Sequence, residues 1–405
     1  MTTPGVLAPL RRSDFRRLWI AQTVSILGDK LGQVALGIMV WQATGSPAQT
    51  GLVFAITFLP AALFGLVAGP FVDRWDRRCT MISADLVRAC LVVAIPFAAP
   101  LGVWAVYLLA FSSATVSLFF EPSRMALVPS VVEQDELMAA NSLDVTTSSI
   151  AELLGIGIAG ALVAGVGTKY AFYIDGVTFV VSALFVFALR HRAAPREIAP
   201  VGLGVILGDL RAGFERIRTN GVLRGLLFTY GAVAIGLGAA ITLSILQALR
   251  VFAGSGLPDA LRMAVVDLST TAGLVVGSIA IGVGGSGRAG LKYVWGMVAF
   301  GVLMLPLCFA KEIGVAALIL FLMGVANEFF GIPMVTMMQT HTEDESRGRV
   351  FAVRMTVTRV ASVIGLAGAG VAAEVYGVTP MIAVVGLYVI GIGFLGFLMP
   401  ALRKA

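Results

Sequence analysis

The sequence predicts an all-α polytopic membrane protein whose twelve transmembrane helices form two six-helix bundles. Three observations lead to this prediction. Hydrophobic residues make up 58% of the 405 residues and charged residues 13%, whereas soluble domains carry about 25% charged residues. The mean hydropathy is +0.93. The apolar residues fall into twelve long runs, and one long polar connection separates the first six runs from the last six.

Each apolar run is long enough to cross the roughly 30 Å hydrocarbon core of a bilayer at about 1.5 Å per helical residue. Short segments containing charged residues, glycine or proline separate neighbouring runs. The expected spans are residues 17–43, 48–72, 79–98, 101–121, 143–166, 170–190, 222–249, 263–284, 291–310, 313–338, 350–375 and 379–401.

The distribution of Lys and Arg predicts the orientation of these spans. Most of the 29 Lys and Arg residues lie in the two tails and the even-numbered connections, and the odd-numbered connections contain only Lys169, Arg250, Arg262 and Lys311. Cytoplasmic loops of membrane proteins are enriched in Lys and Arg. Both termini are therefore expected in the cytoplasm, in a multi-pass protein of the cell membrane. The net charge of +6 then marks a membrane face and does not indicate nucleic-acid binding.

Residues 191–221 form the longest connection, and we expect them to link an N-terminal bundle, residues 1–190, to a C-terminal bundle, residues 222–405. From Leu203 to Ile217, apolar residues recur at helical spacing while charged residues occupy the other side. This pattern predicts an amphipathic helix that lies on the inner leaflet of the membrane.

A dense group of charges lies between the second and third spans, where it has to sit at a bilayer face. The spacing of its residues resembles the loop between the second and third helices of major facilitator superfamily transporters, with Asp76 in place of a second glycine. The resemblance implies the major facilitator fold and a conformational latch at the inner face. An ordinary positive-inside loop is the alternative. The latch residues are Gly69, Asp73, Arg74, Arg77 and Arg78.

Asp29 lies deep in the first span, where an ionisable side chain is costly and marks a functional candidate. Gln22, Ser25 and Gln33 share its helical face. This polar stripe favours the wall of a water-filled cavity for substrate and protons. An ion pair, either within the helix or with another helix, is the alternative, and the neighbouring Lys30 is one candidate component.

Glu152 in the fifth span is the second candidate for proton coupling. The glycines that follow it, beginning at Gly155, resemble the fifth-helix motif of facilitator antiporters, with Ile156 at the position of the family's proline. Helix packing through small residues is the alternative. The fourth span, as predicted, contains Glu121 as its one charge and no arginine.

In the second half, Glu328 and Arg359 lie deep in the tenth and eleventh spans. They are expected either to contact substrate or to pair with each other. Asp85 and Arg88 stand three residues apart in the third span, which favours an ion pair within one helix. A further group of acidic residues falls near span ends, where water is within reach. They are Asp144, Asp175, Asp267 and Glu374.

Several phrases resemble the bacterial macrolide- and siderophore-exporter (enterobactin-type) branch of the same superfamily: residues 14–30, 41–52, 73–89 and 343–353. The resemblance implies export of small amphipathic compounds, as in multidrug resistance, by alternating access and proton antiport. A proton-coupled uptake carrier for a small solute is the first alternative. A non-transporting membrane receptor is the second alternative and ranks below it.

The sequence contains no constellation typical of an enzyme. Its two histidines lie in separate predicted loops, and no Gly-Lys-Ser/Thr phosphate loop is present. We therefore expect no catalytic residues, no metal and no cofactor. The expected partners are a small-molecule substrate, protons and membrane lipids, with no nucleic acid, and the chain is expected to act as a monomer.

Overall fold

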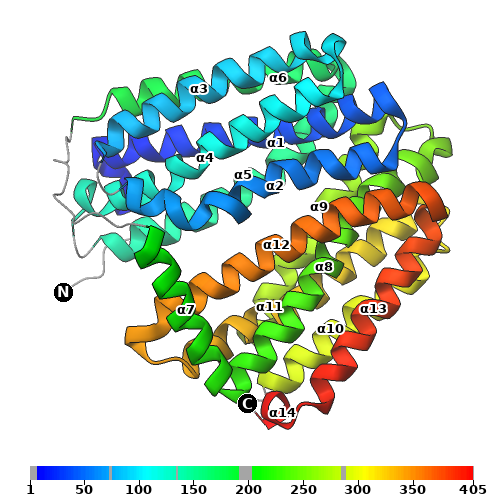
Figure 1. The fold of residues 1–405 in the computed structure, drawn as a ribbon. Helices are drawn as coiled ribbons and strands as arrows, with labels where there is room; N and C mark the ends of the chain where they lie inside the picture. The colour runs from blue at the N-terminus through cyan, green and yellow to red at the C-terminus, as the bar shows by residue number, and fades with distance from the viewer. Residues whose placement is uncertain (1–6, 73–74, 134–135, 191–202, 284–288, 405) are drawn as a thin grey trace. The chain divides into compact units, whose positions relative to one another are not determined.

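The structure, a computed structural model, describes residues 7–72, 75–133, 136–190, 203–283 and 289–404. All regular elements in these ranges are helices (Figure 1). Twelve of them are long and apolar enough to cross a membrane. The predicted all-α fold with twelve spans is therefore confirmed.

The chain divides into two compact units. The first comprises Met1–Met39 and Leu63–Val201, and the second comprises Val40–Ala62 and Gly202–Ala405. The helices of the first half of the chain are η1 (Ala8–Arg11), α1 (Ser13–Thr44), α2 (Pro47–Val72), α3 (Arg77–Ala98), η2 (Ala99–Leu101), α4 (Val103–Val131), α5 (Leu137–Val166) and α6 (Thr168–Phe187).

The second half of the chain repeats the pattern of long helices joined by short connections. Its helices are α7 (Leu203–Thr219), α8 (Gly221–Arg250), η3 (Val251–Ser255), α9 (Asp259–Val283), α10 (Ala289–Leu307), α11 (Ile313–Thr340), α12 (Asp344–Tyr376), α13 (Val378–Leu398) and α14 (Pro400–Lys404).

Several helix ends differ from the predicted spans, and those of α4 and α13 are two examples. The helix α4 does not end at Glu121 but continues to Val131, and the buried Arg124, which follows Glu121, pairs there with the carboxylates of Glu121 and Asp144. The last long helix ends at Leu398, before the predicted limit. Pro400 disfavours helical dihedrals at the preceding residue, and Met399 is extended, with φ −88° and ψ 103°.

The helix predicted within the linker forms as α7. It packs against α12 and α8 in the second unit, as Figure 1 shows for the dark green helix beside orange α12. Asp209 of α7 lies 3.3 Å from Arg349 of α12, and Ile217 is buried. Its place on the inner leaflet stays a prediction.

The core of the first unit lies near the end of the bundle at which α3 begins. Its largest buried members come from five helices that meet there, and burial of such apolar side chains is the main stabilising contribution. They include Phe15, Leu18, Met81, Phe120, Leu127, Leu143 and Val186.

Candidate functional site

An ion pair inside the first unit joins Asp29 of α1 to Arg88 of α3. Arg88 Nη2 donates to Asp29 Oδ1 at 2.5 Å. The Arg88 guanidinium also lies 4.0 Å from the ring centroid of Phe179 in α6, which adds a cation–π attraction. The side chain of Arg88 is 10% exposed and that of Asp29 43% exposed. Water therefore has better access to the carboxylate than to the guanidinium.

The pairing of Asp29 is the cross-helix ion pair that the sequence left open as an alternative, but the partners differ from those expected. Asp29 does not pair with its neighbour Lys30, and Arg88 does not form the expected ion pair with Asp85 of its own helix. The reason is geometric, because packing α1 against α3 presents Arg88 with a carboxylate at the same depth. Of the other polar residues predicted on this face, Ser25 is buried, Gln22 is half-buried and Gln33 is exposed.

Lys30 points to the fifth helix and forms an ion pair with Glu152 of α5. The glycine that follows Glu152 by one turn, Gly155, makes room for this contact, since a Cβ there would lie 3.2 Å from both Cβ and Cγ of Lys30. Part of the glycine-rich run therefore serves close packing of α5 on α1. The role of Glu152 in proton coupling stays a prediction.

Two acidic residues to which the sequence assigned no functional role are the most deeply buried carboxylates among the described residues of the first unit. Asp85 of α3 is 0% exposed and Asp175 of α6 is 3% exposed. Asp175 was expected near water at a span end. Instead its carboxylate lies against α1 where Gly28 and Gly32 leave the helix surface bare. The two glycines on either side of Asp29, at a spacing of four, are the sequence signal for this close approach.

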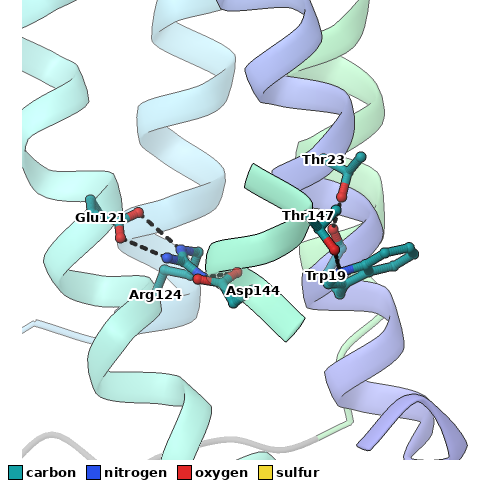
Figure 2. A network of polar contacts seen from close by, with 6 residues as sticks. All are labelled: Trp19, Thr23, Glu121, Arg124, Asp144 and Thr147. Atoms are coloured by element: carbon teal, nitrogen blue, oxygen red, sulfur yellow. Dashed lines mark hydrogen bonds and ion pairs between the residues drawn. The ribbon is translucent and has the colours of Figure 1, made fainter. Parts of the chain in front are cut away.

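A second buried network joins α4 to α5 (Figure 2). The side chain of Arg124 is 7% exposed. Its Nε and Nη2 donate to the two oxygens of Glu121 at 2.9 and 2.6 Å, and its Nη1 donates to Asp144 at 2.7 Å. This bidentate arrangement fixes the geometry as well as the charge. The fourth helix thus contains the arginine that the shorter predicted span lacked.

The same network region ties α1 to α5. Trp19 Nε1 donates to Thr147 Oγ1 at 3.1 Å, and Thr23 Oγ1 donates to the Trp19 carbonyl oxygen at 2.8 Å (Figure 2). Together with the Arg124 contacts, these bonds hold α1, α4 and α5 in one fixed arrangement.

In the second unit, Glu328 and Arg359 do not pair with each other in the described part of the chain. Arg359 Nη1 of α12 donates to the Ala61 carbonyl oxygen of α2 at 2.9 Å. Glu328 of α11 is half-buried and lies against α9, where its Cβ would stand 3.0 Å from a Cβ placed on Gly277. A role for either residue in substrate binding stays a prediction.

The turn predicted as a latch is described in part. Gly69 lies in α2. Asp76 caps α3, because its carboxylate accepts a hydrogen bond from the Cys79 amide at 2.7 Å. Asp73 and Arg74 lie outside the described residues. Arg77 Nη1 donates to the Ala126 carbonyl oxygen at 3.0 Å, and Arg78 Nε donates to the Val186 carbonyl oxygen at 3.2 Å. The two arginines therefore bind the start of α3 to α4 and α6.

Curated relatives of the chain are membrane transporters. YfiS of Bacillus subtilis, an uncharacterised MFS-type transporter, is 27% identical over 390 residues, which cover 93% of this chain and 91% of that protein. Macrolide efflux protein A of Streptococcus pyogenes is 23% identical and covers 96% of each chain. The putative bacilysin exporter BacE of Bacillus subtilis is 24% identical and covers 84% of each.

Solved structures show the same fold at low sequence identity. A point mutant of the nucleoside transporter NupG superposes with a TM-score of 0.75 at 15% identity, covering 96% of this chain and all of that one. A bacterial homologue of the lysosomal transporter Spinster gives a TM-score of 0.74 at 14% identity, with 98% of each chain covered.

The family profile matches nearly the full length of the chain, from residue 18 to residue 366. The twelve candidate spans and the structural neighbours agree with this match. The chain belongs to the Major Facilitator Superfamily, and it is a multi-pass membrane transporter and not an enzyme.

Proposed function

We propose that this transporter exports small amphipathic compounds across the cell membrane in exchange for protons, by alternating access and with both termini in the cytoplasm. Two relatives, a macrolide efflux protein and a putative bacilysin exporter, support the direction and the substrate class. The Asp29–Arg88 pair supports the coupling, because it places an ionisable acid at the middle of a membrane helix.

The mechanism follows from the asymmetry of this pair. Asp29, the more exposed partner, takes up a proton from the outer side, and the buried Arg88 then loses its counter-ion. Removing one member of a buried ion pair costs about 3–5 kcal/mol. Since a tenfold population change needs about 1.4 kcal/mol, protonation of Asp29 is sufficient to change which conformation of the transporter is favoured.

The test is a proton-flux assay in inside-out membrane vesicles with an acidified lumen. Adding a macrolide or a fluorescent lipophilic cation to vesicles that contain the transporter is expected to discharge the pH gradient, as the compound enters and protons leave. Asp29→Asn should abolish the discharge. The matched control is Asp209→Asn, which alters an exposed carboxylate of α7.

Two results would count against the proposal. If Asp29→Asn retains full substrate-dependent proton flux, Asp29 is not the coupling group. If compounds move together with protons, the chain is an uptake carrier. Accumulation of the same probe in intact cells, with and without a protonophore, gives the direction independently.

A further inference from the structure

We propose that Asp175, Asp29 and Asp85 form a ladder of three acids along the interior of the first unit, with Arg88 as their one shared counter-ion. In this ladder Asp85 and Asp175 each hold a proton while Arg88 is paired with Asp29. The participation of the ladder in transport rests on the proposed function. The protonation of its two outer members does not.

The order of the acids follows from the antiparallel register of α3 and α6. Arg88 stacks on Phe179, a Cβ on Gly176 would lie 3.5 Å from the Ala89 carbonyl oxygen, and Arg78 Nε binds the carbonyl oxygen of Val186. Asp85 therefore stands about one helical turn from Arg88 towards the start of α3. Asp175 stands about one turn away in the opposite direction.

Both outer acids interact electrostatically with Asp29 and Arg88. Three carboxylates thus share one guanidinium, and full ionisation would leave two uncompensated negative charges inside the bundle. A buried charge is retained when it is paired and is otherwise neutralised by a proton. Because Arg88 pairs with Asp29, the protons fall on Asp85 and Asp175.

The hydrogen-bond geometry of the buried atoms supports neutral acids. Both oxygens of Asp85 and Oδ1 of Asp175 are buried without a hydrogen-bond partner in the described part of the chain. The Ser182 hydroxyl faces Asp85 and also lacks a partner there. The Ser182 hydroxyl can pair with either form of Asp85, but only the protonated form leaves no uncompensated charge beside the Asp29–Arg88 pair.

The other charges on the surrounding helices are already paired or lie near helix ends. They include the ion pair Lys30–Glu152 between α1 and α5, the network of Glu121, Arg124 and Asp144 on α4 and α5, and Lys169 beside Tyr173 at the start of α6. These groups leave Arg88 as the cation available to the ladder.

The ladder provides a proton-transfer step in which atoms and charges balance. A proton binds Asp29, and Arg88 releases that carboxylate. Arg88 then turns to Asp85 on its own helix, using Nε, which is buried without an acceptor in the described residues. The O–H bond of Asp85 breaks and its proton passes to a water molecule that enters as the inner side opens, so that an Arg88–Asp85 ion pair replaces the Arg88–Asp29 pair. One proton enters, one leaves, and the guanidinium stays charged throughout.

Infrared spectroscopy tests the ladder on the full chain reconstituted in liposomes and labelled with carboxyl-13C aspartate, so that aspartic-acid bands shift away from those of glutamic acid. At neutral pH we expect two carboxylic C=O components from buried aspartic acid. Asp85→Asn and Asp175→Asn should each lose one component. Asp29→Asn should also lose the Asp85 component, because Arg88 then pairs with Asp85 and displaces its proton.

The control Asp209→Asn should retain both components. The ladder is overturned if the wild type shows no protonated aspartic-acid band at neutral pH, or if the bands survive in both Asp85→Asn and Asp29→Asn. These last two variants decide the question even if Asp175→Asn does not fold. If the protein shows both aspartic-acid bands but no substrate-dependent proton flux, the proposed antiport is contradicted. The protonation of Asp85 and Asp175 is then still supported.

Discussion

The carboxylate of Glu374, near the end of α12, binds the N-terminus of α2. Its Oε2 accepts hydrogen bonds from Ser46 Oγ at 2.6 Å and from the Ala48 amide at 3.0 Å, and all three residues belong to the second unit. The first amides of a helix lack acceptors within the helix, and a carboxylate there also meets the positive end of the helix dipole. A helix distant in sequence thus supplies the cap of α2.

Glu374→Ala should remove this cap and lower the free energy of unfolding by about 0.5–2 kcal/mol. Denaturant unfolding in detergent micelles measures the change. The matched control is Glu312→Ala, because Glu312 precedes α11 without a side-chain capping bond. Equal effects of the two substitutions would mean that the Glu374 contact does not stabilise α2.

Gly32→Ala should destabilise the first unit, because the added methyl group would collide with the buried carboxylate of Asp175. Overpacking of this kind costs about 1–3 kcal/mol. Gly331→Ala on α11 is the control, since its methyl group meets nothing within 4 Å and alanine favours helix over glycine. Thermal unfolding of both variants checks the prediction, and a stable Gly32→Ala protein would contradict the close approach of α6 to α1.

Arg88→Gln should destabilise the protein more than Asp29→Asn. Loss of Arg88 leaves the Asp29 carboxylate without its counter-ion, at a cost below the roughly 3–5 kcal/mol of a fully buried pair because the Asp29 side chain is 43% exposed. Loss of Asp29 still leaves Arg88 an acid within reach on its own helix. The double variant should cost less than the sum of the two, by about 0.5–3 kcal/mol. Chemical unfolding of the wild type, the two single variants and the double variant measures this double-mutant cycle. Strictly additive changes in the free energy of unfolding would argue against the Asp29–Arg88 pair.

Arg124→Gln should be far more damaging than Arg12→Gln. Arg124 is buried and neutralises two carboxylates, so that its removal costs about 3–5 kcal/mol. Arg12 pairs with Glu133 and Glu136 at the exposed start of the chain, where the loss should leave the melting temperature unchanged within error. Yield and melting temperature in detergent compare the two variants. Similar values for both would show that the Arg124 network contributes no more than a surface contact.

The sequence was sufficient for the fold because the relevant signals are local. Apolar runs of membrane length identify the helices one by one, and the periodicity from Leu203 to Ile217 identified α7. The helix whose end differs most from the predicted span, α4, continues through Glu121 and Arg124. Their charges look like a membrane boundary in the sequence, and the partner that keeps Arg124 inside the bundle, Asp144, comes from another helix.

The candidate site was predictable only in part, for the same physical reason. An acid such as Asp29 stands out within its own span, so that its importance could be inferred. Its partner could not, because α1 and α3 meet at a depth and rotation that no local pattern encodes. Asp175 was misplaced for this reason as well. Its position near the start of α6 suggests contact with water, but the bare surface of α1 covers it.

The contacts of α7 have a consequence for how the gene can be divided. Asp209 and Arg216 of α7 bind Arg349 and Glu343 at the start of α12, so that α7 is an integral part of the second unit and not a free tether. A break introduced between Arg190 and Leu203 therefore leaves α7 joined to the helix that it binds. Co-expressed as separate fragments, the halves would each retain every helix contact described within its own half of the chain.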